Sequence, residues 1–125
     1  MKVLMSIKPE FANKIFDGTK EFEFRRSIFK DRRVKNVIVY ASSPVQKVIG
    51  EFEIEDILDY DIETLWLETN HGSGISKEFF EQYFFNKEEG YAIKIKKTRK
   101  YRTPLCIKKD FNATPPQSFM YVPAA

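Results

Sequence analysis

Cysteine and histidine are almost absent from this sequence, which contains one of each, Cys106 and His71. A single cysteine excludes a disulfide within the chain, and one cysteine with one histidine does not make a zinc centre. There is also no run approaching the roughly 20 apolar residues that a membrane-spanning helix needs, and the N-terminal residues do not follow the pattern of a secretory signal. We therefore expect a cytoplasmic protein that uses no metal, no cofactor and no membrane. Cys106 lies between Leu105 and Ile107 and is predicted to be buried in a strand.

Aromatic and charged side chains are abundant. The chain has 12 Phe and 6 Tyr among 125 residues, with 42% hydrophobic and 31% charged residues. This composition is too apolar for a disordered chain, and the length is sufficient to bury one hydrophobic core without disulfides. We predict a single domain over residues 1–125, with most of the phenylalanines in its core.

The charges are unevenly distributed, although the net charge is only +3. The segment from Glu51 to Glu68 contains acidic residues and no Lys or Arg, whereas the segment from Lys94 to Lys109 contains basic residues and no acid. This distribution predicts a positive and a negative side of the molecule. The positive side suits a partner that carries phosphates. The alternative is that both segments are ordinary solvated faces, and the sequence assigns no role to the acidic one.

The hydrophobic periodicity predicts short strands with short helices between them. A helix is expected to start at Pro9 and end at Gly18, and Asp61 and Ser76 are expected to cap two more. Strands are expected over residues 2–7, 20–26, 37–41, 47–58, 90–97 and 103–107. About six short strands with two to three short helices favour an α+β, mainly β class. We expect a small, closed or partly closed β-barrel rather than a doubly wound sheet.

The most specific segment reads GTKEFEFR, from Gly18 to Arg25, between the first predicted helix and the second strand. It matches the pattern GxKxxExR, with Gly18, Lys20, Glu23 and Arg25 at the four defined positions. Similar family-like stretches follow elsewhere: Ile7–Glu10, Tyr40–Pro44, Gly74–Ser76 and Pro115–Phe119. In these residues the chain resembles the ASCH domain family. The resemblance implies a fold similar to PUA domains, a cleft between barrel and helix, and a role in RNA binding or RNA metabolism.

The chemistry of the motif fits an anion or nucleobase site. Lys20 provides a point charge for phosphate, and the planar guanidinium of Arg25 pairs with phosphate or stacks on a base. Glu23 is two residues from Arg25, on the same strand face, and either orients Arg25 or accepts a hydrogen bond from a base. Strict alternation places Lys20 on the opposite face, so the three side chains meet only if the chain bends after Gly18. The alternative is an exposed Glu23–Arg25 ion pair, worth about 0–1 kcal/mol.

The preferred hypothesis is a nucleic-acid-binding module with a basic cleft for RNA or a nucleotide-like ligand. The residues predicted to bind are Lys20, Glu23, Arg25, Arg26, Tyr40, Ser42, Ser43, Arg99, Tyr101, Arg102 and Ser118. The alternative is an enzyme in the same cleft, a ribonuclease with Lys20 and Glu23 as its catalytic groups. An amidohydrolase of a modified nucleoside fits less well, because the similar motif of that enzyme has threonine where Glu23 stands. A protein-interaction domain without a nucleic-acid role is a third hypothesis.

Overall fold

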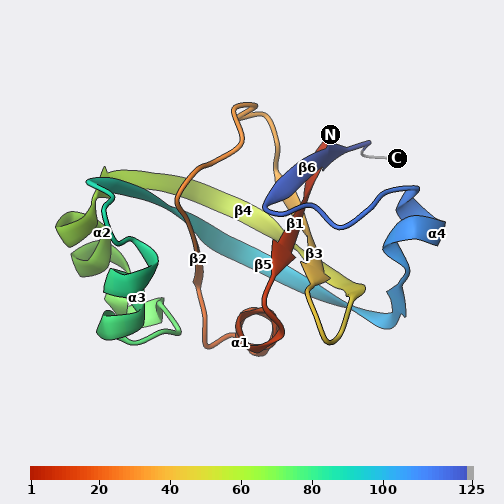
Figure 1. Cartoon of the computed structure of the whole chain (residues 1–125), viewed down its shortest axis with the longest axis horizontal. Helices are drawn as coiled ribbons and strands as arrows, with labels where there is room; N and C mark the ends of the chain where they lie inside the picture. The colour runs from red at the N-terminus through yellow and green to blue at the C-terminus, as the bar shows by residue number, and fades with distance from the viewer. Residues whose placement is uncertain (124–125) are drawn as a thin grey trace.

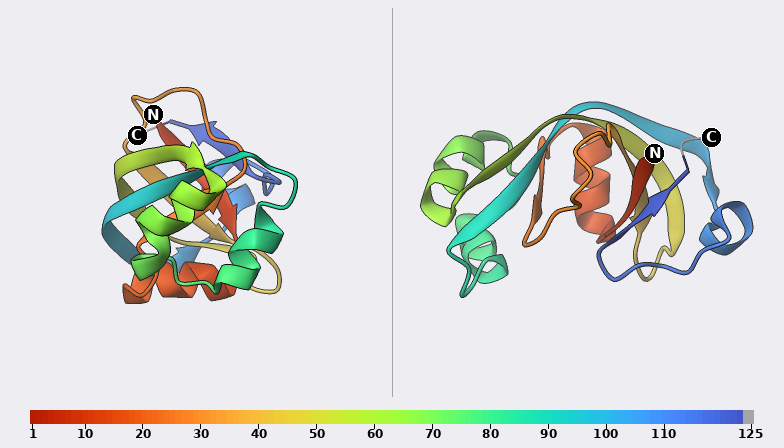
Figure 2. Two further views of the ribbon diagram at one scale, coloured as in Figure 1. Left: turned by 90° about the vertical axis from the view of Figure 1, so that its left-hand side faces the viewer. Right: turned by 90° about the horizontal axis from the view of Figure 1, so that it is seen from above.

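Six strands form one mixed sheet in the order β2-β5-β4-β3-β1-β6, in which the β1–β3 pair is parallel and the other pairs are antiparallel (Figure 1). The computed structural model describes residues 1–123. The strands are β1 (Lys2–Ile7), β2 (Phe22–Arg25), β3 (Asn36–Ala41), β4 (Lys47–Asp61), β5 (Glu89–Leu105) and β6 (Phe119–Val122). The predicted mainly β architecture of about six strands is confirmed, although β6 was not among the strands predicted. The sheet is an arch rather than a closed barrel, because β2 and β6 are its two edges (Figure 2).

Four α-helices accompany the sheet: α1 (Pro9–Asp17), α2 (Ile62–Thr69), α3 (Lys77–Tyr83) and α4 (Ile107–Phe111). Figure 1 shows α2 and α3 at one end of the sheet and α4 at the other. The predicted helix ends are confirmed: Gly18 has φ 88°, Asp61 accepts from the backbone of Thr64, and Ser76 accepts from that of Phe79. Helix α4 adds to the two or three helices predicted. No helix within residues 1–123 is long and apolar enough to cross a membrane.

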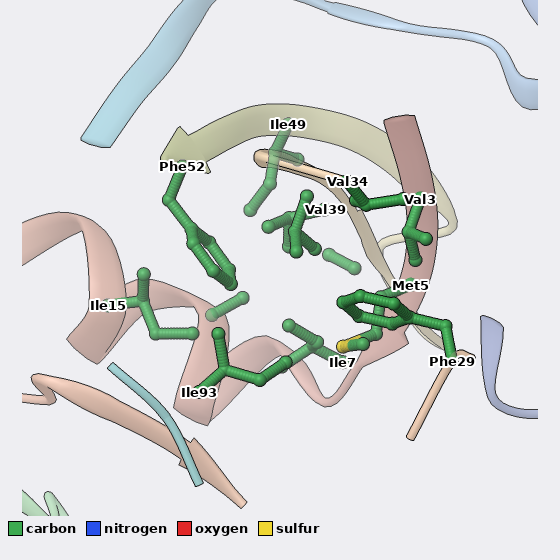
Figure 3. Packing of buried hydrophobic residues seen from close by; sticks show 13 residues of the cluster. Val3, Met5, Ile7, Ile15, Phe29, Val34, Val39, Ile49, Phe52 and Ile93 are labelled. Carbon is green, nitrogen blue, oxygen red and sulfur yellow. The ribbon is translucent and has the colours of Figure 1, made fainter. Parts of the chain in front are cut away.

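The largest cluster of buried side chains lies in the concavity of the sheet, where α1 packs (Figure 3). Phe29 and Phe52 are fully buried there. A second, aromatic cluster joins β2 to α3, with Phe24 and Phe80 in edge-to-face contact at a centroid distance of 5.3 Å. Phe85, which follows α3, is by contrast exposed, with an exposed fraction of 73%. These two clusters fix α1, β2 and α3 relative to one another.

The C-terminal part of β5 differs from the prediction. Two separate strands were expected over residues 90–97 and 103–107, but β5 continues without a break to Leu105, which pairs with Val48 of β4. The expectation of a buried strand around Cys106 is wrong. Cys106 is half-buried and caps α4, with Sγ accepting from the backbone of Lys109 and its own backbone N–H donating to Asp110. The apolar triplet was misleading because the bonds that start α4 are made with Lys109 and Asp110, which lie three and four positions further along the chain.

The predicted separation of charge into two sides is also wrong for the acidic and basic segments. The larger part of each segment forms one of the neighbouring antiparallel strands β4 and β5, so acidic and basic side chains lie beside one another on one ribbon. Ion pairs join them at 3.0 Å (Lys94–Glu55), 3.8 Å (Lys96–Glu53) and 3.2 Å (Arg99–Glu51). Pairing across a ladder depends on strand register, which a linear count of charges does not contain.

Candidate functional site

A cleft of about 550 Å³ opens where the end of β1, helix α1, strand β2, the β3–β4 turn and helix α3 meet. The segment 115–117, which leads into β6, forms part of its wall. The volume falls in the range of about 300–1,000 Å³ that is typical of small-molecule sites. Two kinds of surface line the cleft: aromatic rings from α1, β2 and α3, and polar side chains from β1 and the β3–β4 turn.

Lys20 reaches the cleft because the chain turns sharply after α1. Gly18 takes the left-handed conformation that favours glycine, and the backbone N–H of Lys20 returns to the carbonyl of Lys14 at 3.0 Å. Lys20 as a whole residue is only 3% exposed. Its Nζ donates to the carbonyl oxygen of Ser73 at 2.8 Å and lies 4.7 Å from the ring centroid of Phe24. The ammonium group is therefore held among aromatic rings rather than in water.

Burial is the main reason why the pKa of Lys20 is lowered, from 10.5 to about 8. A charged amine loses its hydration when it is buried, so the neutral form gains relative to the charged one. The carboxylate of Glu23 opposes this effect and the nearby charge of Lys14 reinforces it. The Lys20 ammonium can thus lose its proton at a pH much closer to neutral than an exposed lysine does.

Glu23 and Arg25 point to the same side of β2, as their spacing predicted. Nη1 of Arg25 donates to Oε2 of Glu23 at 3.1 Å, and Nη2 donates to Oγ of Ser118 at 2.7 Å. Glu23 is 6% exposed, so the exposed ion pair considered as an alternative is not what forms. Both residues line the cleft together with Lys20. Just before β2, the backbone N–H of Glu21 donates to the carbonyl of Gly72 at 2.7 Å, while the Glu21 carbonyl accepts from the backbone of Ile95 on β5 at 3.0 Å.

The rim of the cleft carries a stacked pair. The guanidinium of Arg26 lies 4.8 Å from the ring centroid of Tyr83, and its Nη1 donates to the Tyr83 carbonyl at 3.5 Å. Burial raises the pKa of Tyr83, so its hydroxyl stays protonated. The predicted residues Tyr40, Ser42 and Ser43 also line the cleft.

Four predicted residues do not line the cleft. Arg99 and Tyr101 bind Glu51 on another face of the sheet, at 3.2 Å each, and Arg102 is exposed near the end of β5. Burial, followed by the charge of Glu51, raises the pKa of Tyr101 to about 12. Ser118 does not line the cleft itself but holds Arg25. A contact of Arg99, Tyr101 or Arg102 with RNA remains a prediction separate from the cleft.

Several lining residues were not predicted: Lys8, Phe11, Gln46, Ile75, Phe79, Tyr83 and Gln117. Their signals were present but indirect. Lys8 and Ile75 fall in family-like stretches, whereas Phe79 and Tyr83 belong to the apolar stripe of a helix, which equally indicates core. His71 is exposed, packs edge-on against Phe22 and does not line the cleft. Residues 1–123 hold no group of three or more His, Cys, Asp and Glu placed to bind a metal.

This combination of arched sheet and basic, aromatic cleft defines an ASCH-type domain. The ASCH domain family model matches residues 5–99, and the chain belongs to this family, as the motif at Gly18–Arg25 indicated. An ASCH domain-containing ribonuclease of Zymomonas mobilis is 31% identical over 125 residues, which cover 97% of this chain and 84% of that protein. The crystal structure of ASCH from Zymomonas mobilis superimposes with a TM-score of 0.90 at 31% identity, covering 98% of this chain and 88% of that one.

A third relative shows that similar sequence also occurs within a larger protein. The large ribosomal subunit protein uL22 of Ureaplasma parvum is 31% identical over 121 residues, which cover 96% of this chain. The chain spans about two fifths of that relative's length, since the match covers 39% of it.

Proposed function

We propose that this chain binds single-stranded RNA in the cleft at Lys20. The proposal rests on one observation: two cationic side chains, Lys20 and Arg25, line the same cleft of about 550 Å³ as several aromatic rings. Unpaired nucleotides are recognised by aromatic or guanidinium stacking of the base together with cations for the phosphate. The depth of Lys20 favours a splayed-out nucleotide over a duplex, whose phosphates stay on the outside.

The two kinds of lining suit the two parts of a nucleotide. We place the base near Phe24 and the Arg26–Tyr83 pair, because planar rings gain from stacking there. We place the phosphate and ribose near Ser42 and Ser43, where hydroxyl groups offer hydrogen bonds. The ribonuclease name of the Zymomonas relative supports RNA as the ligand class.

Binding is tested by fluorescence anisotropy of a labelled single-stranded RNA at several salt concentrations. We expect saturable binding that weakens with salt, by a slope of about 0.7 per phosphate contact. Arg26→Ala should weaken binding by about tenfold, as loss of one stacking contact of 1–3 kcal/mol implies. Arg33→Ala is the matched control, because Arg33 pairs with Asp31 outside this cleft. An absence of binding at low salt would refute the proposal.

A second candidate function, RNA cleavage, is favoured by the lowered pKa of Lys20 and its closeness to Glu23. In this scheme Glu23 takes the proton of a ribose 2′-hydroxyl, and the 2′-oxygen attacks the adjacent phosphorus. The bond from phosphorus to the 5′-oxygen breaks, and the Lys20 ammonium gives its proton to that oxygen. The products are a 2′,3′-cyclic phosphate and a free 5′-hydroxyl, so atoms and charge balance. Each proton transfer of this kind contributes about 10²–10⁴-fold to a rate.

The cleavage scheme predicts a particular pH profile. Lys20 must be protonated to act as the acid, so the rate should fall as the pH rises through about 8, the pKa of this amine. Denaturing gels at pH 6–10, each with a protein-free lane, measure this rate, and end-group analysis identifies the cyclic phosphate. Lys20→Arg keeps the positive charge, but the guanidinium group does not give up a proton near neutral pH. This variant should therefore bind RNA and leave it intact. If the RNA stays intact with the wild-type protein, the cleavage scheme is refuted and RNA binding without cleavage is the remaining proposal.

A further inference from the structure

The loop formed by residues 72–75, called the cradle loop here, lies between α1 and the start of β2. Three successive carbonyl oxygens of the cradle loop accept hydrogen bonds: that of Gly72 from the backbone of Glu21 at 2.7 Å, that of Ser73 from Nζ of Lys20 at 2.8 Å, and that of Gly74 from Nζ of Lys14 at 2.9 Å. Lys14 itself is half-buried on α1 and does not line the cleft. The cradle loop is therefore fixed on one side by Lys14 and in turn holds the amine of Lys20.

Gly74 lets the cradle loop approach Lys20 closely. Its φ is 68°, and a Cβ at this position would stand 2.7 Å from Cβ and 2.9 Å from Cγ of Lys20. Contacts this short do not occur between real side chains, so any larger residue would displace either the loop or the Lys20 stem. Gly18 also has a positive φ of 88°, but a Cβ there would meet nothing within 4 Å. Of these two glycines with positive φ, Gly74 is therefore the one at which a side chain would meet Lys20.

We propose that Lys14 and Gly74 are positioning residues for Lys20, which hold the cradle loop so that Ser73 presents its carbonyl oxygen to the Lys20 amine at the floor of the cleft. Neither residue needs to touch RNA for this role. Only the RNA-affinity part of the test below rests on the proposed function. The place and the titration of the Lys20 amine are measured without any RNA.

The charges around the Lys20 amine set the direction of the effect. Glu23 on β2 favours its protonation, Lys14 on α1 disfavours it, and Arg25 is engaged by Glu23. Replacing Lys14 with methionine removes a neighbouring positive charge and frees the carbonyl of Gly74, which loosens the cradle loop and admits water. Both changes favour the charged form of Lys20, so its pKa should rise.

The test follows the Lys20 side chain by NMR titration of its ε-methylene group, which is identified by its loss in Lys20→Arg. In the wild type we expect a midpoint near 8. Lys14→Met should raise the midpoint by about half a pH unit or more. Lys14→Arg, which keeps both charge and donor, should restore the wild-type midpoint, and Lys77→Met, the loss of an exposed lysine on α3, should leave it unchanged. An unchanged midpoint in Lys14→Met would overturn the proposal.

Gly74→Ala provides a second, independent variant in case Lys14→Met does not fold. Gly74→Ala should shift the titration midpoint of Lys20. Gly18→Ala, which has comparable backbone strain, should leave it unchanged. Equal midpoints in the two variants would overturn the role of Gly74. RNA affinity is measured in parallel. A shifted midpoint without RNA binding in any variant supports the positioning role and rejects the RNA function. The opposite result is RNA binding that depends on Lys20 but not on Lys14 or Gly74, with unshifted titration midpoints in those variants. It would support the RNA function and reject the positioning role.

Discussion

Lys20→Met should change how the stability of the fold depends on pH. In the folded protein the pKa of Lys20 is lowered to about 8 from 10.5. Between these two values the unfolded chain binds more protons than the folded one, so the free energy of unfolding rises with pH across this window. Below pH 8 the full penalty of a buried ammonium applies, and above pH 10.5 it has disappeared. Methionine has a similar length and no charge, so the variant lacks this dependence.

The size of the effect follows from the shift in pKa. A shift of roughly 2.5 units at 1.36 kcal/mol per unit corresponds to about 3 kcal/mol. Between pH 7 and pH 10 the wild type should therefore gain about 2.5 kcal/mol relative to Lys20→Met. The absolute stability of the variant at pH 7 reflects opposing terms: the buried charge is removed, while the bond to Ser73 and the contact with the Phe24 ring are lost.

Urea unfolding of both proteins at several pH values between 7 and 10 measures this difference. Subtracting the two curves cancels the titration of every other group that the proteins share. Lys77→Met serves as the control, because Lys77 is exposed and its removal should leave the curve parallel to that of the wild type. Parallel curves for the wild type and Lys20→Met would refute the reasoning, since they would mean that Lys20 is as hydrated in the fold as in the unfolded chain.

Further predictions concern stability at pH 7 and are measured by the same unfolding assay. Gly18→Ala should cost about 1–2 kcal/mol through left-handed backbone strain, and Gly74→Ala should cost more, because its Cβ also meets the Lys20 stem; equal losses would contradict this contact. Phe52→Ala should cost about 3–5 kcal/mol by opening a cavity in the core, whereas Phe85→Ala should stay within about 0.5 kcal/mol. Glu51→Ala should cost about 1.5–3 kcal/mol, because its side chain is only 12% exposed and bonds two cations and a tyrosine hydroxyl. A loss below about 0.5 kcal/mol would show that these bonds are open in solution.

Local signals in the sequence predicted the elements well where one residue decides the backbone. Gly18 ends α1, and the side chains of Asp61 and Ser76 cap α2 and α3, because each of these effects acts within a few residues. The prediction failed at Cys106, where an apolar triplet resembles a strand and a cysteine is an uncommon helix cap. It also failed for the charge pattern, because ion pairs across β4 and β5 depend on register.

The sequence by itself determined the family, the strands β1 to β4 and the chemical identity of the motif, since GxKxxExR and the alternation of apolar residues are properties of the linear chain. It also predicted that Glu23 and Arg25 share a face, which needs only the period of a strand. The tertiary structure decided that Lys20 joins them, that Ser118 completes the Arg25 contact from 93 positions away, and that the Lys20 amine is buried against Ser73. The physical reason is that hydration, and with it the pKa of a lysine, depends on which distant segments surround it, and no local pattern of residues records that.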